Sequence, residues 1–185
     1  MRWFPMIGIL LGLAMNWATM IGPDAAEAAS AEEINRDVKN ALEKLYSQSP
    51  SAKALGEKAK GILVFPSIVK GGFIVGGKYG EGALLQGGKT AGYYDAVQVS
   101  YGLQIGLQTY GYVLFFMSDS GLEWLDKSNG WELGVGPTVV VVDVGVSAST
   151  STTTAQSDIY AFFFNQKGLM GGLGLQGTKI SKLKK

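Results

Sequence analysis

The sequence predicts an α+β fold that is mainly antiparallel β, a glycine-rich barrel or sandwich-like sheet with an N-terminal helical pair. Residues 97–107 alternate strictly between apolar and polar or small side chains, as a strand with one apolar face does. The chain holds 27 glycines, about twice the usual share, and many of them separate short apolar runs. Strands outnumber helices and the connections are short, which favours antiparallel strands over alternating β-α units.

The helical pair is expected between residues 30 and 60. Ser30 and Glu33 form a capping box at the start of a helix whose apolar residues recur at helical spacing up to Leu45. This helix should stop near Ser49-Pro50, and Ser51 can cap a second short helix that glycine closes at position 61.

The strands are expected from residue 61 onward. Pro66 should end the first of them, and Gly71-Gly72 should break the chain before the second. Ser120 can cap a helical turn, and residues 147–154 form a loop rich in serine and threonine. The expected strands span residues 62–65, 73–75, 82–86, 97–107, 110–117, one long or two short stretches within 134–146, and a final hairpin of 159–164 and 169–176.

The N-terminal segment has the order of features of a secretory signal peptide. Arg2 precedes an apolar run over residues 6–20, and Ala26-Glu27-Ala28 supplies a small-residue cleavage site. We therefore expect residues 1–28 to be a signal peptide and residues 29–185 to be one domain, helical over 30–60, β-rich over 61–178 and ending in a basic tail over 179–185. The mature protein should be periplasmic or associated with the cell envelope, without a transmembrane helix.

The composition excludes several kinds of chemistry. The chain has no histidine and no cysteine, so it cannot build a Ser-His-Asp or Cys-His arrangement, a zinc site of the usual ligands or a disulfide. A net charge of +1 does not favour nucleic acid as a partner. We expect no cofactor and no enzymatic activity, and an enzyme that uses carboxylates alone is the alternative. Asp143 interrupts a valine run, so it either lies on an outer face or is a buried acid with a functional role.

Two glycine-rich segments resemble nucleotide-binding motifs but lack the required context. Residues 83–90 (ALLQGGKT) approach a P-loop, yet the sequence after them is poor helix sequence, so a hairpin turn is the better interpretation. The glycines between residues 71 and 82 have no β-α-β context and indicate bends or close packing of strands.

A cluster of lysines is the main candidate for binding. Lys53, Lys58, Lys60 and Lys70 lie within a short span, and such a cluster either binds anionic lipid headgroups or forms an ordinary solvated helix face. The basic tail has the same two interpretations.

Three blocks of sequence stand out by their order and spacing. They are residues 59–66 (AKGILVFP) with 71–73 (GGF) and 76–82 (GGKYGEG); residues 101–106 (YGLQIG); and residues 159–162 (IYAF) with 167–173 (KGLMGGL) and Gly177. In this order and spacing the blocks resemble the SYLF domain family, whose eukaryotic members include actin-patch proteins of yeast. The resemblance extends over roughly residues 35–180.

The resemblance implies binding of membrane lipids, with phosphoinositides and actin filaments as ligands of some eukaryotic members. Residues 92–96 (GYYDA) depart from the pattern of many members, and the valine-rich block over 134–145 resembles the exported bacterial branch. The expected partner is therefore an anionic phospholipid membrane rather than actin. The expected lipid-binding residues are Lys53, Lys58, Lys60, Lys70, Phe65 and Phe73.

A non-catalytic envelope module that binds another envelope protein is the alternative function. Such a module would use a sheet edge or an aromatic patch. Tyr93-Tyr94 and the run of phenylalanines at residues 162–164 are the aromatic candidates for it.

Overall fold

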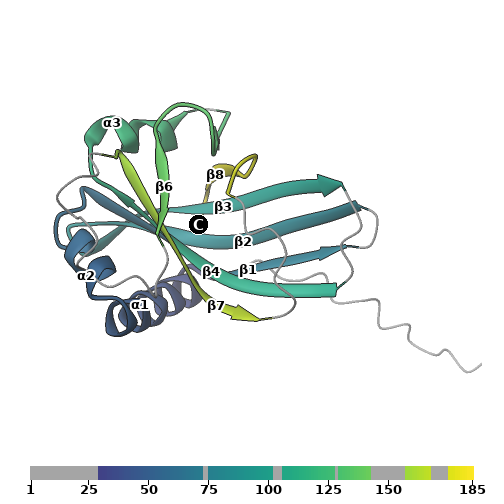
Figure 1. Cartoon of the computed structure of the whole chain (residues 1–185), viewed down its shortest axis with the longest axis horizontal. Helices are drawn as coiled ribbons and strands as arrows, with labels where there is room; N and C mark the ends of the chain where they lie inside the picture. Colours follow the sequence, from purple (N-terminus) through teal and green to yellow (C-terminus); the bar gives the residue numbers. More distant parts are fainter. Residues whose placement is uncertain (1–28, 73–74, 102–105, 128, 143–156, 168–174) are drawn as a thin grey trace, which may run out of the picture.

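The computed structural model describes residues 29–72, 75–101, 106–127, 129–142, 157–167 and 175–185. They form one eight-stranded sheet with two helices packed on its outer face (Figure 1). The elements are α1 (Ala31–Gln48), α2 (Pro50–Gly56), β1 (Gly61–Gly72), β2 (Val75–Gln86), β3 (Lys89–Tyr101), β4 (Gly106–Phe116), α3 (Asp119–Leu122), η1 (Glu123–Asp126), β5 (Trp131–Glu132), β6 (Val139–Val142), β7 (Ile159–Lys167) and β8 (Lys179–Leu183).

The sheet confirms the predicted fold class. Its strand order is β5-β8-β3-β2-β1-β4-β7-β6, and every pair is antiparallel except β6 with β7. In Figure 1 the sheet curls into a half-barrel, and the long strands β1 to β4 run on past the helices. Within the described residues, no helix combines the length and the apolar character needed to cross a bilayer.

The N-terminal helical pair forms as predicted. The Ser30 hydroxyl accepts a hydrogen bond from the Glu33 backbone N–H, and the Glu33 carboxylate accepts one from the Ser30 backbone N–H. Ser49, rather than Ser51, caps α2, because Pro50 occupies the first helical position, where a missing N–H costs nothing. α2 also ends earlier than expected, at Gly56.

The segment that resembles a P-loop is a hairpin turn, as predicted. Gly87 and Gly88 both have positive φ angles, 56° and 78°, and they connect β2 directly to β3. Two central residues with positive φ suit the right-handed twist of a two-residue hairpin. Because a strand and not a helix follows the turn, no helix N-terminus is available to meet a phosphate here.

Strand β1 does not end at Pro66, contrary to the prediction, but continues through a bulge. The register of β1 shifts between Val64 and Val69 against β2, and between Phe65 and Ile68 against β4. Pro66 therefore sits where the ladder is interrupted, so its missing N–H costs no hydrogen bond.

Glycine on β2 allows this bulge to pack closely. A Cβ atom on Gly82 would collide with the Val64 carbonyl oxygen and the Phe65 ring. A bulge bends the strand that contains it and increases its twist, so this bulge contributes to the curl of the sheet.

One other expectation at the level of single strands is wrong. The alternating residues 97–107 contribute to two strands, β3 and β4, which β2 and β1 separate in the sheet. An alternating pattern can persist across a connection, so it did not mark the boundary. The expected basic tail contains strand β8, whose Ile180 is buried beside β3.

The two faces of the sheet have separate cores. On the outer face α1 and α2 cover Val64, Ala83, Val113 and Phe115. On the inner face the segment from η1 to β5 covers the neighbouring residues of the same strands. The largest fully buried side chain, Trp131, lies in that inner core beside Phe116, with 6.0 Å between ring centroids.

Candidate functional site: the uncovered end of the sheet

The helices cover only part of the outer face. Tyr46 of α1 stacks on Phe115 with 6.4 Å between the ring centroids, and Leu45 is fully buried against the same part of the sheet. Beyond the part of the sheet that contacts Tyr46 and Leu45, strands β1 to β4 extend without a helix over them (Figure 1). The next outward-facing side chains along these strands therefore meet solvent.

Five of these side chains are large and apolar, and they lie next to one another. Val69 pairs with Tyr79, which pairs with Val97, so the three form one row across β1, β2 and β3. Val99 follows Val97 on the same face, and Leu107 lies opposite Gly71 on β4. Their exposed fractions run from 38% for Val97 to 73% for Leu107. We call these five residues the strand-end patch.

A contiguous apolar surface of this kind is uncommon on a soluble protein. Such patches mark contacts with other proteins or with membranes. Glycines make the patch shallow: Gly71 and Gly77 lie between its members and present no side chain, and Leu107 reaches over Gly71. The patch is therefore a flat apolar face and not a cleft.

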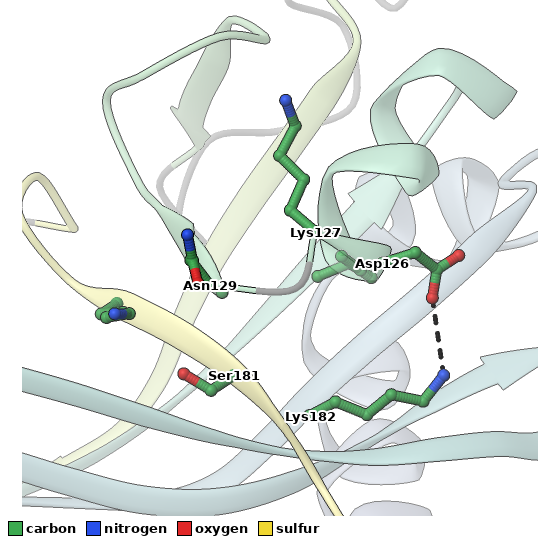
Figure 2. Close-up of a pocket in the computed structure, with 8 residues that line it drawn as sticks. Asp126, Lys127, Asn129, Ser181 and Lys182 are labelled. Carbon is green, nitrogen blue, oxygen red and sulfur yellow. Dashed lines mark hydrogen bonds and ion pairs between the residues drawn. The ribbon is translucent and has the colours of Figure 1, made fainter.

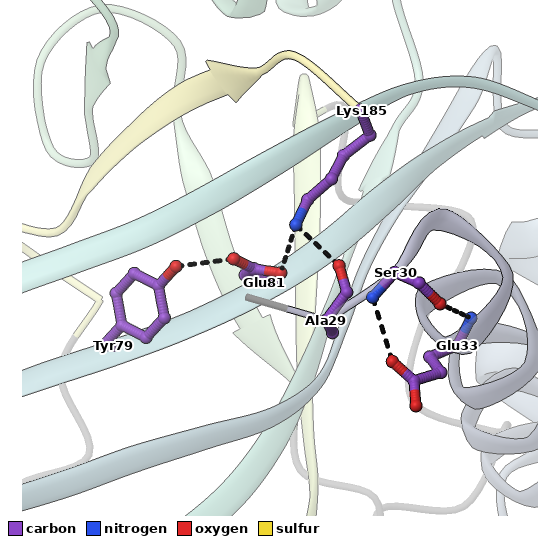
Figure 3. A network of polar contacts seen from close by, with 6 residues as sticks. All are labelled: Ala29, Ser30, Glu33, Tyr79, Glu81 and Lys185. Atoms are coloured by element: carbon purple, nitrogen blue, oxygen red, sulfur yellow. Dashed lines mark hydrogen bonds and ion pairs between the residues drawn. The ribbon is translucent and has the colours of Figure 1, made fainter. Parts of the chain in front are cut away.

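A polar network separates the covered part of the outer face from the patch (Figure 3). The Tyr79 hydroxyl donates a hydrogen bond of 2.7 Å to Glu81, and the Lys185 ammonium group lies 3.1 Å from the other oxygen of the same carboxylate. Lys185 also donates a hydrogen bond of 2.6 Å to the carbonyl oxygen of Ala29. The network thus holds residues 29 and 185 together at the edge of the patch.

Burial changes the acidity of groups in and beside this network. The pKa of Tyr79 is raised to about 12 by burial and by its hydrogen bond to Glu81. Asp95, the cross-strand partner of Glu81, has a raised pKa because it is partly buried, and the Glu81 charge adds to that effect. The two neighbouring carboxylates make the Lys185 ammonium group important for local charge balance.

Two lysines lie on the inner face of the same strand ends. Lys70 and Lys78 are cross-strand partners on β1 and β2, and each is only 6% exposed. Gln108 and Gln98 flank them in the ladder, on β4 and β3. Burial and the nearby charge of Lys70 lower the pKa of Lys78 to about 8. The strand ends therefore combine an exposed apolar outer face with two buried lysines on the inner side.

The structure divides the predicted lysine cluster. Lys53, Lys58 and Lys60 are exposed at the helical end, where the Lys60 backbone N–H bonds to the Phe116 carbonyl oxygen. Lys70 lies nine residues beyond Gly61 on β1, roughly 30 Å along the strand at about 3.3 Å per residue. These four residues do not form one surface.

The aromatic candidates lie in the interior or outside the described residues, except Tyr93, which is half-buried and whose hydroxyl accepts a hydrogen bond from Asn35. Phe65 has no exposed surface and packs on Tyr112 with 4.8 Å between ring centroids, whereas Phe73 lies outside the described residues. Tyr94 and the phenylalanines at residues 162–164 are also buried, so they offer no aromatic patch to a partner protein.

Sequence reasoning missed the strand-end patch although its signal was present. The alternation over residues 97–107 contains Val97, Val99 and Leu107, which are all exposed in the structure. The pattern shows that these side chains share an apolar face. It does not show whether helices or other elements of the protein pack on that face. No group of acidic residues among the described residues could hold a metal ion, and the position of Asp143 lies outside them.

Comparison with known proteins identifies a family. Residues 97–185 match the model of the Ysc84 family, described as Las17-binding protein actin regulator, which is a SYLF domain family. The match covers the end of β3 and everything after it, so it includes three of the five patch residues. A comparison with curated proteins finds no match. The resemblance to the SYLF family is confirmed over residues 97–185.

Proposed function

We propose that this SYLF-family protein binds lipid, and that the strand-end patch enters the surface of a membrane that contains anionic phospholipid. One observation carries the proposal. Five neighbouring apolar side chains are exposed on strands that extend beyond the helices packed on the sheet. The SYLF resemblance supports lipid as the class of ligand.

The energetics suit reversible binding. Full burial of one valine or leucine side chain contributes about 1.5–3 kcal/mol, and the patch residues are already partly covered. Five such side chains would together contribute several kcal/mol, which suits a peripheral protein rather than a permanently inserted one. Lys70 and Lys78 are buried on the opposite face of the sheet, so the preference for anionic lipid is assigned to exposed lysines and not to this pair.

Vesicle sedimentation tests this proposal. Protein purified from the producing cells would be mixed with phosphatidylcholine vesicles, with or without phosphatidylglycerol, at low and high salt. We expect binding that increases with phosphatidylglycerol and is only partly reversed by salt, because apolar contacts are not screened. Failure to sediment with either kind of vesicle would overturn the proposal.

A matched pair of substitutions locates the contact. Val99→Asp places a charge in the patch, whereas Val135→Asp adds the same charge at a valine of similar exposure outside it, 53% against 62%. We expect Val99→Asp to weaken vesicle binding at least tenfold, and Val135→Asp to change it less than twofold. Equal effects of the two changes would show that only net charge matters and would exclude the patch.

The helical-end lysines remain a separate prediction that the same assay tests. Replacing Lys53, Lys58 and Lys60 together with glutamine removes three charges far from the patch. If the sequence-based prediction holds, binding to anionic vesicles falls by about 1 kcal/mol per lysine. If only the patch variants lose binding, the membrane contact lies at the strand ends alone.

We also propose that the protein is exported and acts by binding rather than by catalysis. The lack of histidine and cysteine supports the second point, and the predicted leader supports the first. Cleavage after Ala28 would leave Ala29 as first residue, and the carbonyl of Ala29 is already held by Lys185. The mass of the protein recovered from the producing cells tests export: a mass that includes residues 1–28 would contradict it.

An envelope protein is the alternative partner for the same patch. A flat apolar sheet face can pack on another protein as well as on lipid. If the partner is a protein, the unsubstituted chain would not sediment with vesicles. Val99→Asp would then cause no change in that assay.

A further inference from the structure

Two lysines flank the strand-end patch in one row across the outer face of the sheet. The strand registers place Lys167 of β7 opposite Thr109 of β4, and Thr109 opposite the patch residue Val69. On the other side of the patch, Val97 of β3 lies opposite Lys179 of β8. The whole row, in order from β7 to β8, is Lys167, Thr109, Val69, Tyr79, Val97 and Lys179.

Both lysines point to the same side as the patch. Residues directly opposite each other in antiparallel strands share a face of the sheet, so Lys167 and Lys179 lie on the outer face. Both are exposed, and the ion pairs among the described residues involve other lysines. Their ammonium groups are therefore available to a partner that covers the patch.

The other lysine of β8 does not belong to this row. Figure 2 looks into the hollow beside β8, where the Lys182 side chain runs away from Ser181 to Asp126. The Lys182 ammonium nitrogen lies 3.5 Å from an Asp126 oxygen. Lys179 is two residues before Ser181 on the strand and shares its face, so the two lysines of β8 serve different surfaces.

The curl of the sheet determines how deeply each part of the row can reach. Trp131 of β5 and Val139 of β6 come from the two edge strands, and both pack in the inner core. The inner face is therefore the concave one, and the outer face of the half-barrel is convex (Figure 1). On a convex face the central strands β1 and β2 stand nearest to a flat partner, and β7 and β8 lie further back.

This order of depths matches the layers of a lipid surface. The apolar side chains in the middle of the row reach the boundary of the acyl chains, and a lysine stem further back carries its ammonium group to the headgroups. The row crosses five strand-to-strand steps of about 4.8 Å, so the two lysines stand roughly 24 Å apart along the sheet. That separation exceeds the Debye length of about 10 Å at 0.1 M salt, so the two lysines act independently.

We propose that Lys167 and Lys179 contact anionic phospholipid headgroups on either side of the inserted strand-end patch. They give the patch its preference for anionic lipid, and they set the orientation of the sheet with β7 and β8 at headgroup depth. This assignment rests on the proposed lipid binding of the patch and names the residues that select the lipid.

Glu132 provides a test of the sign of the interaction. It is exposed and follows Lys179 in the same row, on β5. A negatively charged membrane attracts Lys179 and repels Glu132. We therefore expect Lys179→Gln to weaken binding to phosphatidylglycerol vesicles about fivefold and Glu132→Gln to strengthen it two- to fivefold. A purely structural role of this edge would not give opposite signs.

Vesicle sedimentation of the purified protein tests the row. We expect Lys167→Gln/Lys179→Gln to lower the affinity for phosphatidylcholine vesicles that contain phosphatidylglycerol at least tenfold, with the two single effects multiplying. The affinity for pure phosphatidylcholine vesicles should change less than twofold. The matched control is Lys39→Gln/Lys44→Gln, which removes two exposed lysines from α1 and should change either affinity less than twofold.

The row and the patch can fail separately. An equal loss in the α1 control, weaker binding in Glu132→Gln, or an equal loss with both kinds of vesicle in the double variant would overturn the assignment of the two lysines. The patch contact would survive each of these results, because it is tested by Val99→Asp, which should weaken binding to both kinds of vesicle. If the unsubstituted chain sediments with neither kind of vesicle, the lipid contact of the patch and the role of the two lysines are both wrong.

Discussion

The two ends of the outer sheet face have the same architecture but different surroundings. At one end Val64, Ala83 and Phe115 lie under α1 and α2 and are fully buried. At the other end Val97 and Leu107 occupy the same face of the same sheet and are exposed. The two ends differ in whether helices pack over the sheet, and not in the sequence pattern of the strands. Apolar alternation alone therefore cannot distinguish core residues from a binding surface.

The covered end should show the largest effect of a single substitution. Phe115→Ala removes a ring that packs on Tyr46 and on Phe162, the latter with 5.6 Å between centroids. We expect the free energy of unfolding to fall by about 3–5 kcal/mol, because the cavity cannot close between a sheet and a helix. Denaturant titration followed by circular dichroism measures this. A loss below about 1 kcal/mol would mean that the helical cover is loosely packed.

The boundary between the two ends should show a smaller effect. Lys185→Gln removes the cation beside Glu81, whose side chain is 9% exposed and which faces Asp95 across the strands. We expect a loss of about 1–3 kcal/mol in unfolding free energy, because a poorly solvated carboxylate is left without its charge partner.

The exposed ion pair of α1 is the matched control for this change. Lys39→Gln breaks a contact of 4.0 Å to Glu43 in solvent, which should cost less than about 0.5 kcal/mol. Similar losses in the two variants would remove the argument that Lys185 has a structural role at the patch boundary.

The inner side of the uncovered end predicts a pH dependence. Because the pKa of Lys78 falls to about 8 in the folded state, an unfolded chain binds more protons than the folded one between pH 8 and the usual lysine pKa of about 10.4. Stability should therefore rise with pH from pH 8 to 9.5, by at most about 1.4 kcal/mol per pH unit. Above pH 10 the raised pKa of Tyr79 acts in the opposite direction.

Denaturant titrations at several pH values test this dependence. In Lys78→Met the rise should disappear, whereas Lys44→Met, a change at an exposed lysine of α1, should keep it. A rise of equal slope in all three proteins would assign the effect to other groups.

The uncovered end itself should show the smallest effect on stability. Leu107→Ala shortens a side chain that is 73% exposed, so the unfolding free energy should change by less than about 0.5 kcal/mol. The same change should weaken vesicle binding measurably. A large loss of stability would mean that Leu107 is part of the folded core and not of a binding surface.

The sequence was sufficient for the elements that depend on local chemistry. The Ser30–Glu33 capping box, the stop at Ser49 and the hairpin at Gly87-Gly88 are each set by a few neighbouring residues. The family resemblance was also readable, because its glycine-rich blocks keep their order. These features do not require knowledge of the sheet.

The features that depend on long-range pairing were not predicted. The passage of β1 through Pro66 requires Gly82 on the next strand, and the burial of Lys70 requires a curled sheet around it. The pairing of β5 with β8 requires a segment about fifty residues earlier in the sequence to lie against β8. Charge clustering in the sequence therefore indicated the right kind of residue but not the surface to which each lysine belongs.

The contact between Ala29 and Lys185 has a consequence for engineering. Because a side chain of residue 185 reaches the backbone of residue 29, a short glycine-rich linker should join the two positions without distorting the sheet. New ends could then be opened at the exposed Gly87-Gly88 turn, which would give a circular permutant with every strand pairing retained.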